Sequence, residues 1–167
     1  MDVLTRARED DARRIAELHI ASWRATYIRE LSPEFHDSQD VASRTAEWRG
    51  HLADGVTVIL AEGADQLDGF VACGPMRGRS SNEVEWEIYN LHVAPARHGE
   101  GLGSKLFNAA AELGRQRGAR QLVLWVVKTN NLARAFYETK GMTYDGGEQA
   151  HVRGDQTLHK VRYRMGL

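Results

Sequence analysis

The sequence predicts an α/β fold of the α+β kind, in which one mixed sheet of about seven strands carries helices on both faces. Apolar residues recur with strand and helix spacing in the order β-α-α-β-β-β-α-β-α-β-β along the chain. Residues 121–127, QLVLWVV, form a nearly unbroken apolar run, which is typical of a strand covered on both sides. The 167 residues suit one domain, and no repeat, linker or low-complexity tract divides them. We therefore expect a single domain over residues 1–167.

The first quarter of the chain predicts a strand and two helices. Residues 3–8 alternate as a short strand, and Asp10 or Asp11 can cap the helix that follows. Apolar residues continue that helix at helical spacing until the chain breaks at Pro33. A second helix is then expected over about residues 37–52.

A β-hairpin and a central strand follow. Residues 56–62 and 67–76 predict two strands, and the hairpin between them lies at 63–66. Residues 85–93 alternate as a third strand of this half. Pro95 ends its ladder, because proline has no N–H group to donate.

The second half alternates helices and strands. An amphipathic helix begins near Leu102 and is closed by Gly118, and the apolar strand of residues 121–127 comes next. Asn130 begins a fourth helix that ends at Gly141. The last two predicted strands are residues 143–149 and 157–165.

Composition and charge exclude several classes of partner. The net charge is −1 with a pI near 6.7, which favours neither nucleic acid nor an anionic membrane as a partner. The single cysteine, Cys73, cannot form an internal disulfide and suits a reducing compartment. The N-terminal segment has no apolar core typical of a secretory signal, and no apolar run approaches the ~20 residues that span a bilayer. We expect a cytoplasmic protein, and no metal site, because the histidines show no HxxxH-type spacing.

The stretch after the central strand predicts an anion-binding loop. Gly99, Gly101 and Gly103 stand at every second position just before the helix that starts near Leu102. Glycines without side chains let a ligand approach the backbone, and the first N–H groups of a helix point toward the loop with the positive end of its dipole. Together these features suit a pyrophosphate. The spacing is neither the GxGxxG of a dinucleotide fold nor the GK[ST] of a P-loop. A turn that binds nothing is the alternative.

This loop resembles the acyl-CoA site of the GNAT superfamily of N-acyltransferases, in which a strand and a short turn are followed by [QR]xxGx[GA]. The segment His98–Gly103 matches both glycines, with His98 in place of Gln or Arg. The order of elements is similar to the GNAT fold over nearly the full length. The resemblance implies that loop amides bind the pyrophosphate of acetyl-CoA and that the central strand pairs with the pantetheine arm. The coenzyme-binding residues it implies here are Leu91, His92, Val93, His98, Gly99, Glu100, Gly101, Leu102, Gly103 and Ser104.

A second GNAT-like motif covers the fourth helix. Asn130, Ala133, Phe136 and Tyr137 match the family spacing, with Gly141 four residues further on. In the family this helix lies beside the pantetheine arm, its Asn binds the arm, and its Tyr protonates the leaving thiolate. The resemblance therefore implies that all four residues contact the coenzyme and that Tyr137 is the general acid. The alternative for Tyr137 is a half-buried packing residue.

The central strand also predicts a place for the amine. Glu83, Glu85 and Glu87 lie at i, i+2 and i+4, so a strand projects all three from one face. Such crowding favours a bound cation and raises the proton affinity of at least one carboxylate. Glu87 is the candidate general base and Glu85 the second candidate, and Glu85 also lies in the predicted acceptor site. Some GNAT enzymes take the base from the fifth strand, where this chain has Trp125. A solvated strand face is the alternative.

Aromatic residues of the first helix complete the prediction. Trp23 and Tyr27 resemble the SWRxxY stretch of a GNAT subgroup, in which this region walls the acceptor site. With Phe35 they are expected to line the acceptor cleft, and packing of the helix against the core is the alternative.

We expect an acetyl-CoA-dependent N-acetyltransferase that acts by direct transfer on a primary amine of a small molecule or peptide. A non-catalytic acyl-CoA sensor and a protein-interaction domain are the alternatives. The residues leave the amine open among a polyamine, an aminoglycoside, an amino acid and a peptide N-terminus, and they leave a homodimer through the last strands open as well.

Overall fold

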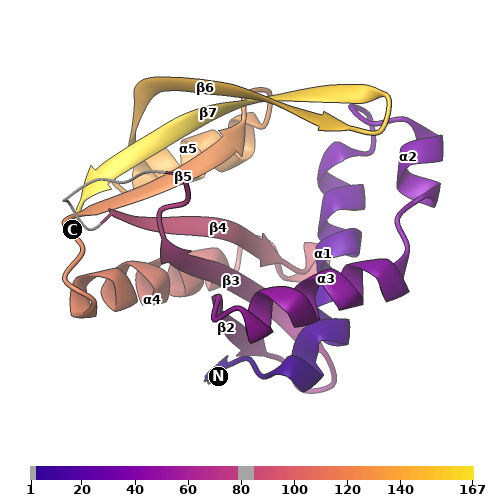
Figure 1. Cartoon of the computed structure of the whole chain (residues 1–167), viewed down its shortest axis with the longest axis horizontal. Coiled ribbons are helices and arrows are strands. Elements are labelled where there is room, and N and C mark those ends of the chain that lie inside the picture. The colour runs from indigo at the N-terminus through magenta and orange to yellow at the C-terminus, as the bar shows by residue number, and fades with distance from the viewer. Residues whose placement is uncertain (1–2, 79–84) are drawn as a thin grey trace. The chain divides into compact units, whose positions relative to one another are not determined.

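The computed structural model describes residues 3–78 and 85–167, and its sheet has seven strands in the order β1-β2-β3-β4-β5-β7-β6 (Figure 1). The strands are β1 Val3–Arg6, β2 Thr57–Glu62, β3 Leu67–Pro75, β4 Glu85–Val93, β5 Gln121–Val127, β6 Thr143–Arg153 and β7 Gln156–Gly166. The helices are α1 Ala12–Tyr27, α2 Pro33–Asp37, α3 Val41–Ala53, α4 Leu102–Gln116 and α5 Asn131–Thr139. The predicted α+β class, with a mixed sheet of seven strands, is confirmed.

The chain packs as two compact units. Unit 1 is Met1–Cys73 with Asn90–Ala110, and unit 2 is Gly74–Tyr89 with Ala111–Leu167. Each of β3 and β4 contributes residues to both units. A single domain over residues 1–167 stays a prediction.

Unit 1 is built on antiparallel strands with helices on two faces. β1 pairs with β2 from Val3↔Glu62 to Arg6↔Ile59, and β2 pairs with β3 across the predicted hairpin. On β3, an added Cβ at Gly69 would lie 2.9 Å from Leu106 of α4, so glycine lets that helix approach closely. The next residue, Phe70, faces the opposite way and contacts the rings of α1 and α3. Helices therefore cover both faces of β3.

Two helix boundaries in unit 1 differ from the prediction. Pro33 does not leave a simple break, because it is the first residue of the short helix α2, where its missing N–H costs nothing. Ser32 caps that helix by accepting a hydrogen bond from the Phe35 amide at 3.2 Å. α3 then begins at Val41 instead of near residue 37, because Asp40 accepts the Ser43 amide at 2.8 Å and fixes the start of the helix.

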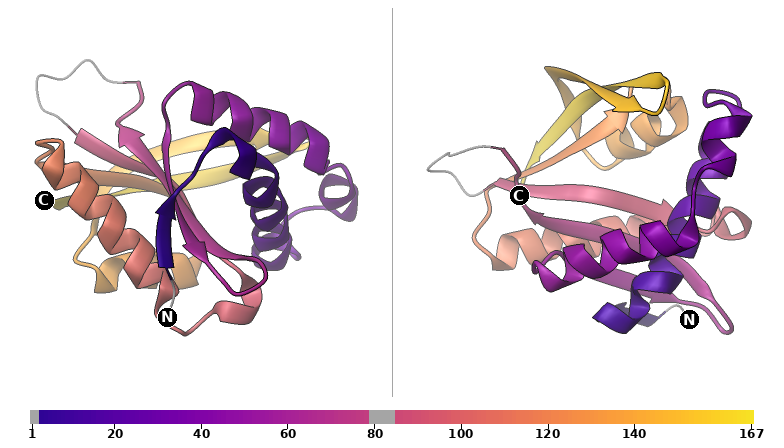
Figure 2. Two further views of the ribbon diagram at one scale, coloured as in Figure 1. Left: turned by 90° about the horizontal axis from the view of Figure 1, so that it is seen from below. Right: turned by 45° about the vertical axis from the view of Figure 1, so that its right-hand side comes forward.

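Unit 2 combines a parallel and two antiparallel strand pairs. β4 pairs in parallel with β5 from Glu85↔Gln121 to Ile88↔Leu124, and β5 pairs with β7 along its whole length. β6 and β7 form the long twisted hairpin drawn in gold and yellow in Figure 2. Both strands are longer than predicted, since their pairing continues to Arg153↔Gln156 and the turn forms at Gly154, which has a positive φ of 60°.

Alternation along these strands assigns each side chain of unit 2 to a face. Leu124 and Tyr163 are register partners, and the Tyr163 hydroxyl donates to Glu138 of α5 at 2.8 Å. α5 therefore covers the Tyr163 face. Glu87 pairs with Val123, one position away from Leu124, so its side chain projects from the other face.

No helix in the described ranges combines the length and the apolar character that a membrane span requires.

Candidate functional site

The glycine loop has the geometry of a helix start with exposed amides. After a short 3₁₀ turn over Pro95–Arg97, Gly99 and Gly101 adopt positive φ angles of 83° and 80°. The Lys105 amide donates to the Gly101 carbonyl at 3.2 Å, which is the first hydrogen bond of α4. The amides of Leu102 and Gly103 come before it in the chain, so they belong to the group of N–H donors that a helix cannot satisfy internally.

Open space lies in front of this loop. An added Cβ at Gly99 or at Gly101 would meet nothing within 4 Å, and residues 98–101 are exposed. Apart from the chain neighbours of each glycine, no side chain of the described residues comes within 4 Å of these two Cβ positions. The loop thus offers backbone donors and the positive end of a helix dipole to an anion from solvent.

A buried ion pair holds the loop in this shape. Asp68 of β3 is 2% exposed and binds the guanidinium of Arg97, whose Nε donates to Glu100 at 2.8 Å. The Ala94 amide donates to the Asp68 carbonyl at 2.8 Å, which ties the end of β4 to β3. Sequence analysis missed Asp68 and Arg97. The signal for Asp68 was a lone carboxylate inside an otherwise apolar strand, where a charge needs a partner.

His98 stands where the family pattern has Gln or Arg. Its Nε2 donates to the Val93 carbonyl at 3.0 Å, so the ring bridges the loop and the end of β4. The imidazole therefore braces the strand predicted to receive the pantetheine arm. Glu100 also takes part in bracing, through Arg97.

The three predicted acceptor-site aromatics lie together in unit 1. Trp23 and Tyr27 have ring centroids 4.8 Å apart, and Phe35 of α2 lies 6.4 Å from Trp23. Tyr27 is buried, whereas Trp23 and Phe35 are half-buried. The buried His36 donates from Nε2 to the Tyr27 carbonyl at 3.0 Å and so fixes α2 against the end of α1. α2, which the sequence analysis missed, is the element that brings Phe35 to Trp23.

His92 extends this group with an uncharged imidazole. Its Nδ1 is hydrogen-bonded to the Ser22 hydroxyl at 2.9 Å, and its ring lies 4.8 Å from the ring of His19 and 5.3 Å from that of Phe70. Burial, followed by the nearby Arg44 charge, lowers the pKa of His92 to about 4. The side chain of His92 therefore faces α1 and is neutral at pH 7, while its backbone belongs to the predicted coenzyme strand.

The prediction that β4 presents a face of unpaired negative charge is wrong. Glu85 and Glu87 do project from one face of unit 2 and are 6% and 5% exposed. Each has a basic partner, however: Arg164 of β7 binds Glu85, and the guanidinium of Arg77 lies 3.6 Å from Glu87. Glu83 lies outside the described residues. The partners come from other strands and turns, so alternation along β4 alone could not indicate them.

Glu87 has the environment of a proton acceptor. One of its oxygens accepts the Arg77 backbone amide at 3.0 Å. Burial raises the pKa of Glu87, and the Arg77 amide and guanidinium and the Lys160 charge oppose that rise in part. A buried carboxylate with an elevated pKa binds a proton more readily than an exposed one.

α5 carries the predicted thiolate acid. Its N-cap is Asn130, whose Oδ1 accepts the Ala133 amide at 3.2 Å. Tyr137 is 8% exposed, and Phe136 packs edge-on against it with ring centroids 5.3 Å apart. Within unit 2, Glu87 and α5 belong to opposite faces of the sheet.

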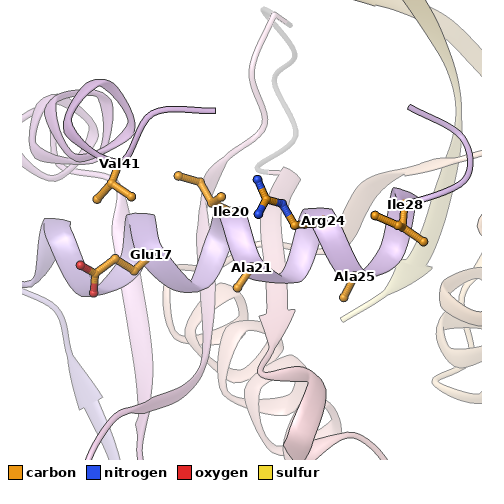
Figure 3. A pocket seen from close by; sticks show the side chains of 7 residues that line it. All are labelled: Glu17, Ile20, Ala21, Arg24, Ala25, Ile28 and Val41. Atoms are coloured by element: carbon orange, nitrogen blue, oxygen red, sulfur yellow. The ribbon is translucent and has the colours of Figure 1, made fainter. Parts of the chain in front are cut away.

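A separate cavity of about 490 Å³ lies along α1 (Figure 3). None of the predicted site residues lines it. Its lining residues are Glu17, Ile20, Ala21, Arg24, Ala25, Ile28 and Val41. In residues 3–78 and 85–167, no cluster of three or more His, Cys, Asp or Glu side chains could hold a metal ion, and Cys73 is fully buried.

Comparison with known proteins gives a consistent result. Residues 12–142 match the model of the Acetyltransferase (GNAT) family. An uncharacterized N-acetyltransferase of Bacillus subtilis (strain 168), YuaI, is 27% identical over 155 residues, which cover 92% of this chain and 88% of YuaI.

Solved structures share the fold. The structure of yncA from Salmonella typhimurium with its cofactor acetyl-CoA has a TM-score of 0.74 and 20% identity, over 100% of this chain and 94% of that one. The PaiA N-acetyltransferase of Thermoplasma acidophilum in complex with coenzyme A has a TM-score of 0.73 and 16% identity, over 100% and 99% of the two chains.

Proposed function

Because the chain belongs to the Acetyltransferase (GNAT) family of enzymes, we propose that it moves an acetyl group from acetyl-CoA directly to a primary amine. The observation that carries this proposal is the open glycine loop at the start of α4. Its two positive-φ glycines have free space where a Cβ would stand, and the loop leads into the N-terminus of α4, whose first amides have no partner within the helix. Relatives of the same fold that were solved with acetyl-CoA or coenzyme A support the choice of donor.

The loop residues have the chemistry to hold the coenzyme. The amides of 99–103 would bind the diphosphate, and the Asp68–Arg97 pair keeps the loop ordered before it binds. Leu91 and Val93 would pair with the pantetheine amides as an added strand does. When bound, acetyl-CoA supplies a thioester that an amine attacks, with release of the CoA thiol.

Glu87 is the proposed general base. An alkyl amine has a pKa near 10, so only about one molecule in a thousand is neutral at pH 7, and a carboxylate that accepts the amine proton removes this obstacle. The burial-raised pKa of Glu87 suits that role. Glu85 is held by Arg164 instead, and we assign it to the structure of the β4–β7 face.

Tyr137 is the proposed general acid. Its hydroxyl would donate a proton to the thiolate sulfur as the thioester breaks, while Glu87 Oε accepts the proton lost by the amine.

The test is release of CoA thiol from acetyl-CoA across a panel of amines, repeated with Glu87→Gln and Tyr137→Phe. We expect turnover with at least one amine and a loss of about 100-fold or more in kcat for each variant. Binding of acetyl-CoA without turnover of any amine would favour the sensor. Failure of millimolar CoA to raise the melting temperature would favour the interaction domain, because a specific ligand stabilises the folded state.

A further inference from the structure

Among the described residues, the face of unit 2 that carries Glu87 has more basic than acidic side chains once its cross-strand partners are counted. Register places Lys160 beside Val127 and Gln149, and Arg162 and Arg164 follow at alternate positions of β7 on the same face. Arg162 and Arg164 both bind Asp145, and Arg164 also binds Glu85. These two arginines are therefore neutralised.

Lys160 is different from its neighbours on this face. It is half-buried, and no ion pair joins it to a carboxylate among the described residues. Burial lowers the pKa of the Lys160 ammonium, and the charges of Arg153 and Arg77 lower it further, against the attraction of Glu87. A half-buried cation whose one nearby carboxylate, Glu87, already has Arg77 as its partner is stabilised when a further anion binds beside it.

A second group next to Lys160 also has an incomplete environment. His151 pairs with Leu158 and Gln149 pairs with Lys160, so His151 and Lys160 are diagonal neighbours on one face of the hairpin. The Nε2 atom of His151 is buried and has no hydrogen-bond partner in the described part of the chain. Burial, Arg153 and Lys160 all lower the pKa of His151, in that order.

We propose that Lys160, with His151 beside it, forms a subsite for an anionic group, a carboxylate or a phosphate, carried by the acceptor amine. This inference rests on the proposed function, since it adds a specificity contact to the same reaction. Lys160 and Glu87 lie close enough for each charge to act on the other. A molecule held by its anion at Lys160 presents its own amine next to the proposed base. The acceptor class is then an amino acid or a phosphorylated amine, and polyamines are excluded.

The first experiment uses matched acceptors that differ only in the anion. Phenylalanine is compared with phenethylamine, and phosphoethanolamine with ethanolamine, each with saturating acetyl-CoA; spermidine represents the polyamines. We expect the anionic member of one pair to have the higher kcat/KM, and the preferred pair tells carboxylate from phosphate. Lys160→Gln should reduce the kcat/KM of the anionic member about 10- to 100-fold relative to that of the neutral member, because any effect of the lost charge on Glu87 is common to both.

Lys128→Gln is the matched control, because Lys128 is an exposed lysine of the same unit, paired with Glu148 at 3.1 Å. The Lys128→Gln substitution should change the kcat/KM of neither member of a pair. Preference for spermidine or for the neutral amines, or an equal loss for both members in Lys160→Gln, would overturn the subsite.

The second experiment does not depend on turnover. Inorganic phosphate is titrated into the full chain while the ring resonances of His151 are followed by NMR at several pH values. Phosphate at Lys160 should raise the pKa of His151, because it compensates the two neighbouring cations, and Lys160→Gln should abolish the effect. If phosphate does not change the pKa of His151, the subsite is rejected, even if the protein acetylates amines. A response to phosphate in a protein that acetylates no amine would keep the anion site and reject the transferase.

Discussion

Replacement of Gly101 by alanine separates the conformational role of the loop from its binding role. Gly101 has a φ of 80°, where an L-residue with a Cβ costs about 1–2 kcal/mol. For a chain of this size, that loss lowers the melting temperature of the free protein by about 2–8 °C. Gly118, at the end of α4, has nearly the same φ of 77° and equally free space, so Gly118→Ala should show a similar loss.

The two variants should differ in their response to CoA. At a concentration 100 times its Kd, a ligand stabilises the folded state by about 2.7 kcal/mol. The Cβ of Gly101→Ala would enter the space proposed for the diphosphate, and a tenfold weaker Kd would remove about 1.4 kcal/mol of that stabilisation. Thermal melts with and without CoA measure both effects in one assay. A Gly101→Ala protein that keeps the full CoA-induced shift, as Gly118→Ala should, would refute the assignment of the loop to the coenzyme.

Three further predictions concern titratable groups that are buried or half-buried. The pKa of His92 is about 4 in the folded chain against an ordinary 6.5, so the unfolded chain binds more protons between these values and stability falls as the pH drops from 6.5 toward 4. The loss from pH 7 to pH 5 is about 2 kcal/mol; urea melts of His92→Phe should lack it, whereas the exposed His159→Phe should retain it. In the active enzyme, kcat/KM should rise with pH through the raised pKa of Glu87, and a Glu87→Gln profile that keeps this limb would contradict the base assignment. Glu85→Gln should lower the free energy of unfolding by about 1–3 kcal/mol, because Arg164 loses a buried carboxylate. Its kcat should stay near that of the wild type, and a loss as large as that of Glu87→Gln would return Glu85 to the catalytic machinery.

Local pattern was sufficient for most of the fold and for the shape of the loop. Helix and strand periods gave the order of elements, and the alternate glycines gave the start of α4, since a positive φ is a property of single residues. α2 was missed because Pro33 has two opposite effects, ending one helix and beginning the next, and only the Ser32 cap decides between them.

The net charge of the sheet face that carries Glu85 and Glu87 could not be predicted from local pattern. Alternation along β4 correctly put Glu85 and Glu87 on one side, but the sign of that side depends on which residues of β7 and of the turn after β3 lie opposite. Arg164 is 79 positions from Glu85 in sequence, and it reaches that carboxylate only because β5 pairs with β4 on one edge and with β7 on the other. A row of carboxylates in one strand is therefore better evidence for basic side chains on the neighbouring strands than for a cationic ligand. Glu85 and Glu87 are already paired, whereas no carboxylate of the described residues forms an ion pair with Lys160, and the ligand that we propose for it is an anion.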